Sequence, residues 1–374
     1  MRHFDYSFLE SAAIPARLAK MIGEIGEFQE REKVLKKTFP DAFIGLEIVA
    51  KGRSVKCSND LEGLTLSDFR FNEVVFRDWS PLNQAEKETV GYRDALNLVF
   101  SQWNELDIRE SDICRLHETM TPKTRTNRGR YKDSDNVIMG FDISGEPGAD
   151  FAPMPAAQTA EAMKGLILAY GEARDNLAAD GLLLIPCFIL DFLCVHPFSE
   201  GNGKISRLLS HLLLNKNGFD AGRYISFEEQ INKNKASYFQ AFKESSKDWH
   251  TGNNDYFPFV TNFVATLLTC HRLIDKRFAY VDGEKGDRGF TIVRGRGANN
   301  RERIESALLN SPVPISKRRL CQLLPDVKPT AVRTILKAML KAGLITQVGL
   351  ARSAKYFRRE LTAKKPRREN PKEK

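Results

Sequence analysis

An almost unbroken apolar run near the middle of the chain most strongly limits what this protein can fold into. Residues Leu182–Val195 contain one charged side chain, Asp191, among apolar neighbours. The run is shorter than the roughly 18–20 residues that span a bilayer, and it is long enough to form a buried central helix. Helical patterns also dominate from Glu110 to about Arg277. The sequence therefore predicts a mainly α-helical protein with this helix at its centre.

Length and composition are those of a soluble globular protein with two or three domains. The chain has 374 residues, of which 42% are hydrophobic and 28% are charged, and these values are ordinary for that class. No apolar run approaches the length of a membrane span, and the first residues lack the pattern of a secretory signal. The six cysteines are scattered without a Cys-x-x-Cys pair, which favours reduced thiols over disulfides or zinc ligands. We expect a cytoplasmic protein without a membrane partner.

The order of helical patterns, turn residues and charged stretches divides the chain into five parts. Residues 1–109 are interpreted as an N-terminal helical region and 110–280 as a helical core. Within the core, turn residues at 127–132 followed by a β-branched run at 137–140 predict a short hairpin. The remaining parts are a Gly- and charge-rich linker at 281–298, a small domain at 299–361 and a basic tail at 362–374.

The small domain has the pattern of a winged helix-turn-helix. Three helices are expected, the second with Ser316 as N-cap and the third opened by Pro329. A two-stranded wing is expected to follow around Gly349, and the third helix of this fold commonly enters the DNA major groove. The expected elements are helices at Asn300–Leu309, Lys317–Leu324 and Thr330–Ala342 and strands at Leu344–Val348 and Lys355–Arg359.

Positive charge is concentrated in this C-terminal part. From Ser316 to the end there are 17 Lys and Arg residues against four Asp and Glu residues, in a chain whose total net charge is +9. Arg333, Lys337 and Lys341 are spaced four residues apart and lie roughly on one face of the third helix. Contact with DNA phosphates through this face and the tail is one interpretation. A module for protein contacts or dimerisation, or a basic tail that aids solubility, is the alternative.

The twelve residues HPFSEGNGKISR, numbers 196 to 207, combine the groups that a nucleoside triphosphate site needs. The turn Gly201–Gly203 precedes an expected helix, and successive N–H groups there can form an anion nest. Glu200 supplies a hard oxygen ligand for a Mg²⁺ that also holds phosphate oxygens. Lys204 and Arg207 add positive charge beside the same phosphates. His196 follows the buried helix and is a natural general base near neutral pH.

This segment resembles the signature of the Fic family, which reads H-x-F-x-D/E-G-N-G-R-x-x-R. The resemblance extends to Gly129–Gly140, which is similar to the flap that aligns a target segment by strand addition. It continues in Phe151–Pro155, before the central helices, and in Asn234–Phe239, which is similar to a helix that helps to hold the nucleotide. It covers about residues 30–270 and implies a Fic helical core with a short β-hairpin flap.

The resemblance implies a protein adenylyltransferase that moves AMP from ATP onto a Ser, Thr or Tyr hydroxyl of a protein target, which can be the chain itself. It implies that His196 deprotonates the hydroxyl, which attacks the α-phosphorus while pyrophosphate leaves, and that Glu200 holds Mg²⁺. The implied nucleotide-binding residues are Gly201, Asn202, Gly203, Lys204, Arg207, Asn234 and Tyr238, and the implied target-positioning flap residues are Val137, Ile138 and Met139.

Two positions within the signature bear on the expected activity. Lys204 stands where the family usually has arginine, so the positive charge is kept while the bidentate fork is lost. A related phosphotransferase branch has Ala-Asn where this chain has Gly201-Asn202. The glycine therefore favours transfer of AMP over transfer of phosphate.

A second motif, Ser58–Gly63, matches the family's inhibitory pattern S/T-x-x-x-E-G/N. Ser58 and Glu62 are one helical turn apart and are expected on one face of a helix. The resemblance implies that Glu62 pairs with Arg207 and blocks productive ATP binding within the same molecule. It also implies that this glutamate supports removal of AMP in some members. An ordinary capped surface helix is the alternative interpretation.

Two rival functions remain open at this point. One is a DNA-binding transcriptional regulator whose Fic domain senses ATP, and the other is a Fic enzyme that transfers another phosphate-containing group. The intact His196 favours an enzyme, because a sensor needs no general base. This class of Fic protein often forms dimers, so a homodimer is among the expected partners. The other histidines considered lack metal-like spacing and are interpreted as core or surface residues: His117, His211, His250 and His271.

Overall fold

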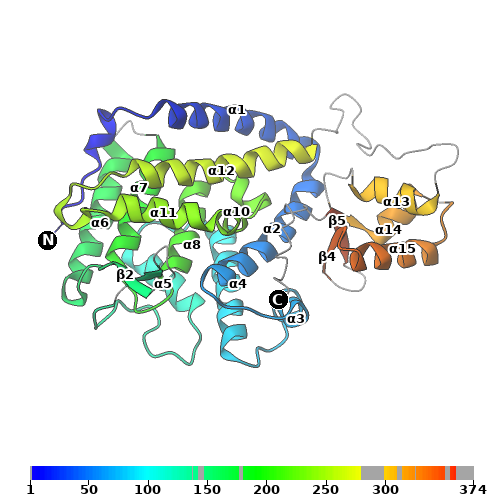
Figure 1. Ribbon diagram of the computed structural model, residues 1–374, viewed down its shortest axis with the longest axis horizontal. Coiled ribbons are helices and arrows are strands. Elements are labelled where there is room, and N and C mark those ends of the chain that lie inside the picture. Colours follow the sequence, from blue (N-terminus) through cyan, green and yellow to red (C-terminus); the bar gives the residue numbers. More distant parts are fainter. Residues whose placement is uncertain are drawn as a thin grey trace, which may run out of the picture. The chain divides into compact units, whose positions relative to one another are not determined.

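The computed structural model describes residues 2–136, 138–141, 147–176, 180–278, 299–309, 314–324, 326–349 and 354–358. Helices predominate, as expected from the sequence, and the chain divides into two compact units, Met1–Lys276 and Arg277–Lys374 (Figure 1). The first unit contains both the N-terminal helices and the helical core. The predicted linker at 281–298, the basic tail at 362–374 and the flap residue Val137 lie outside the described residues.

The described part of the first unit consists of helices and one short hairpin. Within it, two 3₁₀ helices, Ser7–Glu10 and Trp249–Thr251, accompany the α-helices. The α-helices are α1 (Ala16–Thr38), α2 (Pro40–Leu61), α3 (Asp68–Phe76), α4 (Gln84–Gln102), α5 (Glu110–Met120), α6 (Ala156–Asn176), α7 (Gly181–Val195), α8 (Asn202–Lys216), α9 (Ala221–Tyr224), α10 (Phe227–Lys233), α11 (Lys235–Ser246) and α12 (Phe257–Phe278).

Helix α7 is the buried central helix that the apolar run predicts. Every residue from Leu182 to Val195 is buried, and the helix packs against α6 and α8. Asp180 caps its first turn, because the carboxylate accepts a hydrogen bond from the N–H of Leu182 at 2.8 Å. The helix ends at Val195, and the next residue, His196, has a left-handed backbone with φ 52°. The turn after α7 therefore lies at the start of residues 196–207, which carry the candidate catalytic and phosphate-binding groups.

The first residues of the chain are anchored to α7 through a buried carboxylate. Asp191 accepts hydrogen bonds from the Tyr6 hydroxyl (2.8 Å), Trp249 Nε1 (2.6 Å) and the Tyr256 hydroxyl (2.9 Å). It also forms an ion pair with Arg2 at 3.5 Å. A buried charge is tolerated when it is paired and hydrogen-bonded in this way. The N-terminal segment is therefore part of the core.

Helix α12 differs from the expectation that no segment reaches the length of a membrane span. It has 22 residues, its most apolar stretch of 18 residues has a mean hydropathy of 1.2, and by length and composition alone it could cross a bilayer. However, 56% of its apolar window is buried inside the protein. Figure 1 shows α1 alongside it, and the pairs Glu24–Arg272 (2.5 Å) and Glu32–His271 (2.7 Å) join the two helices. These contacts are those of a core helix.

The hairpin consists of β1 (Ile138–Phe141) and β2 (Pro147–Phe151), which pair antiparallel. Met139 lies opposite Ala149, and the register shifts between Ile138 and Met139. The predicted hairpin is therefore present, and its first strand lies in the β-branched run at 137–140. The second strand, which the sequence analysis did not locate, follows it in the chain.

Residues 127–132 do not pair as a strand because their backbone groups are used elsewhere. The N–H of Lys132 donates to the carbonyl of Pro197 at 2.8 Å, and the N–H of Gly129 donates to His117 Nδ1 at 3.0 Å. These bonds hold the segment against α5 and against the loop that follows α7.

In the second unit, the described residues form three helices and a small antiparallel sheet with the order β3-β5-β4. The helices and the β4–β5 pair lie within one residue of the predicted bounds, and the two-residue strand β3 was not predicted. Its core is formed by residues that are 0–2% exposed, among them Ile304, Leu320, Leu336 and Ile345. The elements are α13 (Asn300–Leu309), β3 (Ile315–Ser316), α14 (Lys317–Leu323), α15 (Pro329–Lys341), β4 (Ile345–Val348) and β5 (Lys355–Arg358).

Candidate active site

The loop between α7 and α8 is closed by one buried side chain. Asn202 accepts a hydrogen bond from the N–H of Phe198 (2.9 Å) and donates to the carbonyl of the same residue (2.7 Å). Gly201 precedes α8 with φ +78°, a conformation that favours glycine. The side chain of Asn202 therefore shapes the loop. Any contact that this residue makes with phosphates would come from its backbone.

The carbonyl groups of this loop are held by residues that lie earlier in the sequence. Asn136 Nδ2 donates to the carbonyl of Phe198 at 3.1 Å, the N–H of Lys132 donates to Pro197, and His117 Nε2 lies 3.2 Å from the carbonyl of Glu200. Meanwhile the first N–H groups of α8 have no partner within the helix. Such a helix start is an anion site with a positive dipole end.

His196 is held as a neutral base. Its Nδ1 lies 3.3 Å from the carbonyl of Leu193, which can only accept, so Nδ1 carries the proton and Nε2 is the free basic atom. Burial lowers the pKa of His196 to about 4, and the charge of Lys132 adds to this effect. The carbonyl of Leu193 and the carboxylate of Glu62 act in the opposite direction. Near neutral pH the imidazole can therefore accept a proton.

The structure brings Ser58 and Glu62 to Arg207. The hydroxyl of Ser58 accepts bonds from Nε (3.1 Å) and Nη2 (3.0 Å) of Arg207, and Glu62 Oε1 accepts from Nη2 at 2.7 Å. Burial acts to raise the pKa of Glu62, but the charge and hydrogen bond of Arg207 outweigh it and hold the pKa below the usual value. The carboxylate is therefore ionised and paired with the last cation of the motif.

Glu62 also lies directly over the start of α8. A Cβ added at Gly203 would be 2.7 Å from Glu62 Oε1, a distance that real Cβ atoms do not show. A side chain at this position would therefore have to displace the carboxylate of Glu62. A negative oxygen occupies the space in front of the helix N-terminus, which is where a phosphate oxygen would bind.

The remaining charges of the motif are paired as well. Lys204 is 4% exposed, and its Nζ lies 3.5 Å from Glu88 Oε2 on α4. Burial lowers the pKa of Lys204, and Glu88 opposes that shift. Glu200 forms an ion pair with Arg125 at 3.2 Å, with 42% of its side chain exposed. Glu62, Glu88, Glu200 and Lys204 all line one cavity of about 200 Å³.

The other predicted site residues differ in how closely they lie to the motif. Tyr238 lies near Arg207 and Glu62, and burial raises its pKa to about 12. Asn234 is exposed between α10 and α11, where its amide donates to the carbonyl of Gln230 at 3.3 Å. Ile138 and Met139 lie in β1. Of these residues, Tyr238 is the one that the described contacts connect to the motif.

His117 is a residue of the site that the sequence analysis assigned to the core or surface. It is fully buried, and its ring stacks on Phe198 with 3.9 Å between centroids and 4° between planes. Because Nδ1 accepts from Gly129, Nε2 carries the proton and donates to Glu200. The sequence feature that could have indicated this role is the position of His117 in α5, shortly before the turn at Gly129. Glu88, Arg125 and Lys132 were also missed, because nothing in their local sequence connects them to the motif.

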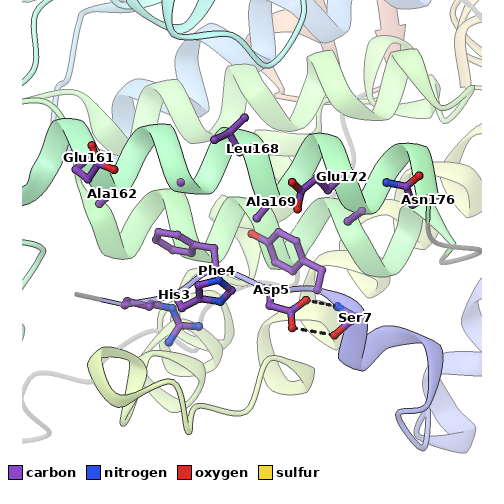
Figure 2. A pocket seen from close by; sticks show the side chains of 14 residues that line it. His3, Phe4, Asp5, Ser7, Glu161, Ala162, Leu168, Ala169, Glu172 and Asn176 are labelled. Carbon is purple, nitrogen blue, oxygen red and sulfur yellow. Dashed lines mark hydrogen bonds between the residues drawn. The ribbon is translucent and has the colours of Figure 1, made fainter.

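A larger cavity, of about 510 Å³, lies between the N-terminal segment and α6 (Figure 2). Residues 2–7 form one wall, and α6 residues such as Glu161, Leu168 and Glu172 form the other. In Figure 2 Asp5 bonds Ser7 on this wall. None of the motif residues lines this cavity. The smaller cavity at the start of α8 is therefore the candidate site, despite its size.

Comparisons with known proteins agree with this location. A family model described as the Fic/DOC family matches residues 107–214. A Fic family protein from Desulfovibrio desulfuricans is similar over 95% of this chain and 99% of its own, with 18% identity and a TM-score of 0.57. A Fic domain containing signaling protein from Bacteroides thetaiotaomicron is similar over 69% of this chain and 96% of its own, with 20% identity and a TM-score of 0.52. At these identities the likeness shows a shared fold. No curated protein sequence matches significantly.

Proposed function

Residues 107–214 form a Fic/DOC domain, and from this premise we propose that the protein is an adenylyltransferase that moves AMP from ATP onto a hydroxyl side chain of a protein. Members of this family typically transfer nucleotide groups onto proteins. The observation that carries the proposal is the placement of a neutral imidazole and a helix N-terminus on one short loop.

The residues of the loop divide the reaction between them. His196 Nε2 takes the proton of a Ser, Thr or Tyr hydroxyl as the oxygen forms a bond to the α-phosphorus of ATP. The bond between the α-phosphorus and the bridging oxygen breaks, and pyrophosphate leaves with that electron pair. The free N–H groups at the start of α8, with Lys204 and Arg207, hold the phosphate oxygens. Such donors stabilise charge that develops during transfer.

Glu200 is the residue suited to hold Mg²⁺. Its carboxylate is partly exposed at the cavity, and no three His, Cys, Asp or Glu side chains of the described ranges form a complete metal site. This fits Mg²⁺, which commonly uses one or two carboxylates and takes its other ligands from water and phosphates. When bound, the ion would offset negative charge on the phosphates. Arg125, which pairs with Glu200 Oε1, would compete with the ion for this carboxylate.

The same geometry supports self-inhibition by Glu62. Its carboxylate pairs with Arg207 and lies over Gly203, so a phosphate group and Glu62 compete for one space and one cation. About one third of the Glu62 side chain is exposed, and it lies at the end of α2, where it can move without unpacking a helix. We propose that displacement of Glu62 precedes productive binding of ATP, and that AMP removal is a second activity to test.

Intact mass spectrometry after incubation with ATP and Mg²⁺ tests the proposal. The expected result is addition of one or more AMP groups to the chain or to an added protein, larger in Glu62→Gly than in wild type because the competing carboxylate is gone. His196→Ala should remove the addition. Addition of phosphate would instead favour the phosphotransferase alternative. Equal addition in wild type and Glu62→Gly would contradict inhibition by Glu62.

A second candidate function, DNA binding by the C-terminal unit, is favoured by the surface of α15. Arg333, Lys337 and Lys341 are exposed, and none has an ion-pair partner among the residues that the structure describes. We propose that this unit is a winged helix whose α15 contacts DNA phosphates. Binding to a random duplex that weakens steeply with salt, and that is reduced in Arg333→Ala/Lys337→Ala, is the expected result. Absence of binding at low salt would leave the protein-contact interpretation.

A further inference from the structure

A buried lysine lies against the end of α7, beside the proposed catalytic base. Lys132 is 5% exposed, and its Nζ donates to the carbonyl of Val195 (3.4 Å) and to Asn136 Oδ1 (2.9 Å). No carboxylate of the described residues lies within ion-pair distance of it. A buried ammonium with neutral partners alone is costly. Its location therefore needs a reason other than an ion pair.

The end of α7 supplies this reason. Val195 is the last residue of the helix, and the final carbonyl groups of a helix lack partners within the helix and carry its negative dipole end. A lysine at that point satisfies a carbonyl and is stabilised by the dipole. The backbone of Lys132 is fixed at the same place, because its N–H donates to Pro197. The residue thus bonds both neighbours of His196.

We propose that Lys132 is the positioning residue of His196, acting from outside the Fic motif by holding the carbonyl groups on both sides of the base. Its side chain sets where α7 stops and its main chain sets where the following turn begins. Asn136 completes the arrangement by orienting the ammonium and by bonding Phe198. The role of His196 as a base rests on the proposed function, but its placement does not.

Lys132 also acts on the protonation of the base. The charged groups that act on the His196 ring are Lys132, which lowers its pKa, and Glu62 from the end of α2, which raises it. Burial lowers the pKa of Lys132 itself to about 8, against the opposing charge of Asp135, so this residue is mostly charged at neutral pH. Loss of the ammonium should therefore let His196 take up a proton at higher pH.

The test is an NMR titration of the His196 ring from pH 8 to 4.5, in the full chain without ATP. Lys132→Met removes the charge and the bond to Val195, and Lys132→Gln removes the charge while keeping a donor. We expect the pKa of His196 to rise by about one unit in both variants, with Lys132→Arg close to wild type. The six histidines make assignment through His196→Ala practicable.

Lys216 provides a matched control. Its Nζ also donates to backbone carbonyl groups, of Leu106 (2.7 Å) and Trp103 (3.4 Å), but it ends α8, about 18 Å along the helix from Lys204. Lys216→Met should leave the His196 titration unchanged. Where AMP transfer is measurable, Lys132→Met should lower its rate about tenfold or more, and Lys132→Gln should lower it less.

The outcomes separate this inference from the proposed function. An unchanged His196 titration in Lys132→Met and Lys132→Gln, or an equal shift in Lys216→Met, would overturn the inference whatever the activity. The expected titration shift without any AMP transfer in wild type or Glu62→Gly would support the role of Lys132 and count against the adenylyltransferase. If Lys132→Met does not fold, Lys132→Gln and Lys132→Arg still decide the question.

Discussion

Each charged residue of the motif has a partner from outside the motif. Arg207 is held by Glu62 (2.7 Å), Lys204 by Glu88 (3.5 Å), and Glu200 by Arg125 (3.2 Å). A buried cation without such a partner would be costly, so the pairs of Arg207 and Lys204 stabilise the protein without nucleotide, whereas the exposed pair of Glu200 and Arg125 contributes little. They also oppose ligand binding, because phosphates and Mg²⁺ need the same atoms.

Glu88 should therefore weaken nucleotide binding. In a Glu62→Gly background, Glu88→Gln leaves the Lys204 ammonium free for a phosphate, and ATP should bind about threefold to tenfold more tightly. Titration calorimetry with ATP and Mg²⁺ measures the change. Asp94→Asn, the same loss of charge at an exposed position of α4, is the control and should have little effect. Weaker binding in Glu88→Gln would instead show that Glu88 keeps Lys204 charged for the ligand.

The protonation of His117 should make stability depend on pH. Burial lowers its pKa to about 4, whereas the unfolded residue titrates near 6.5. The contribution of neutral His117 to the free energy of unfolding is therefore fully present above about pH 6.5. It is lost as the pH drops towards 4, because the unfolded chain takes up the proton first. The loss for this residue approaches about 3 kcal/mol at the lower end.

Urea unfolding at pH 7 and pH 5 measures this dependence. His117→Asn cannot take up the proton, so its free energy of unfolding should fall less between the two pH values than that of wild type. His196 contributes in the same direction in both proteins. Equal losses in wild type and variant would mean that His117 is not the titrating group.

The elements around the site are fixed by side chains that bond main-chain atoms. Helix α7 stops at Val195, α8 starts after Gly201, and the loop between them is closed by Asn202 and held by His117. Each bond satisfies a buried loop group that no helix or strand partner supplies. The loop is therefore held in place by these side chains, as a positioned base requires.

Asn202→Ala should destabilise the loop between α7 and α8 by more than the small size of the lost side chain suggests. The N–H of Phe198 would lose its partner in a buried place, and stability should fall by about 2 kcal/mol. Asn217→Ala, at the other end of α8, is the control: its Nδ2 donates to the carbonyl of Leu213, and its loss should cost less. Urea unfolding of both variants tests this. Equal losses would mean that Asn202 does not specially stabilise the loop.

At the scale of the whole molecule, the proposed chemistry belongs to one of the two compact units. The motif, Glu62, Lys132 and His117 all lie in Met1–Lys276. The exposed cations of α15 lie in the other unit. Nucleotide chemistry and contact with a polyanion can thus be separated along the chain.

A chain that ends at residue 298 should therefore keep AMP transfer in the Glu62→Gly background. Its rate should lie within about twofold of the full chain if the second unit is an accessory module. Affinity for a DNA duplex should be lost at the same time. A large fall in transfer with unchanged unfolding of the remaining chain would show that the second unit takes part in the reaction.

The sequence by itself determined the features that depend on neighbouring residues. The apolar run located α7, the Gly-Asn-Gly turn located the start of α8, and caps and periodicity located the C-terminal helices within one residue. Such signals lie within one or two turns of chain, because capping and amphipathic periodicity act over that range. The twelve-residue motif likewise contains its candidate base, metal ligand and phosphate-binding groups within one short stretch of sequence.

Only the tertiary structure decided which distant groups meet. His117 reaches Glu200 across 83 residues and Lys132 reaches Val195 across 63, and no local pattern encodes either contact. For the same reason the sequence predicted the hairpin without locating the strand that pairs with β1, which the structure places at Pro147–Phe151. Ion pairs and backbone bonds between remote segments depend on how helices pack, and packing is a property of the whole chain.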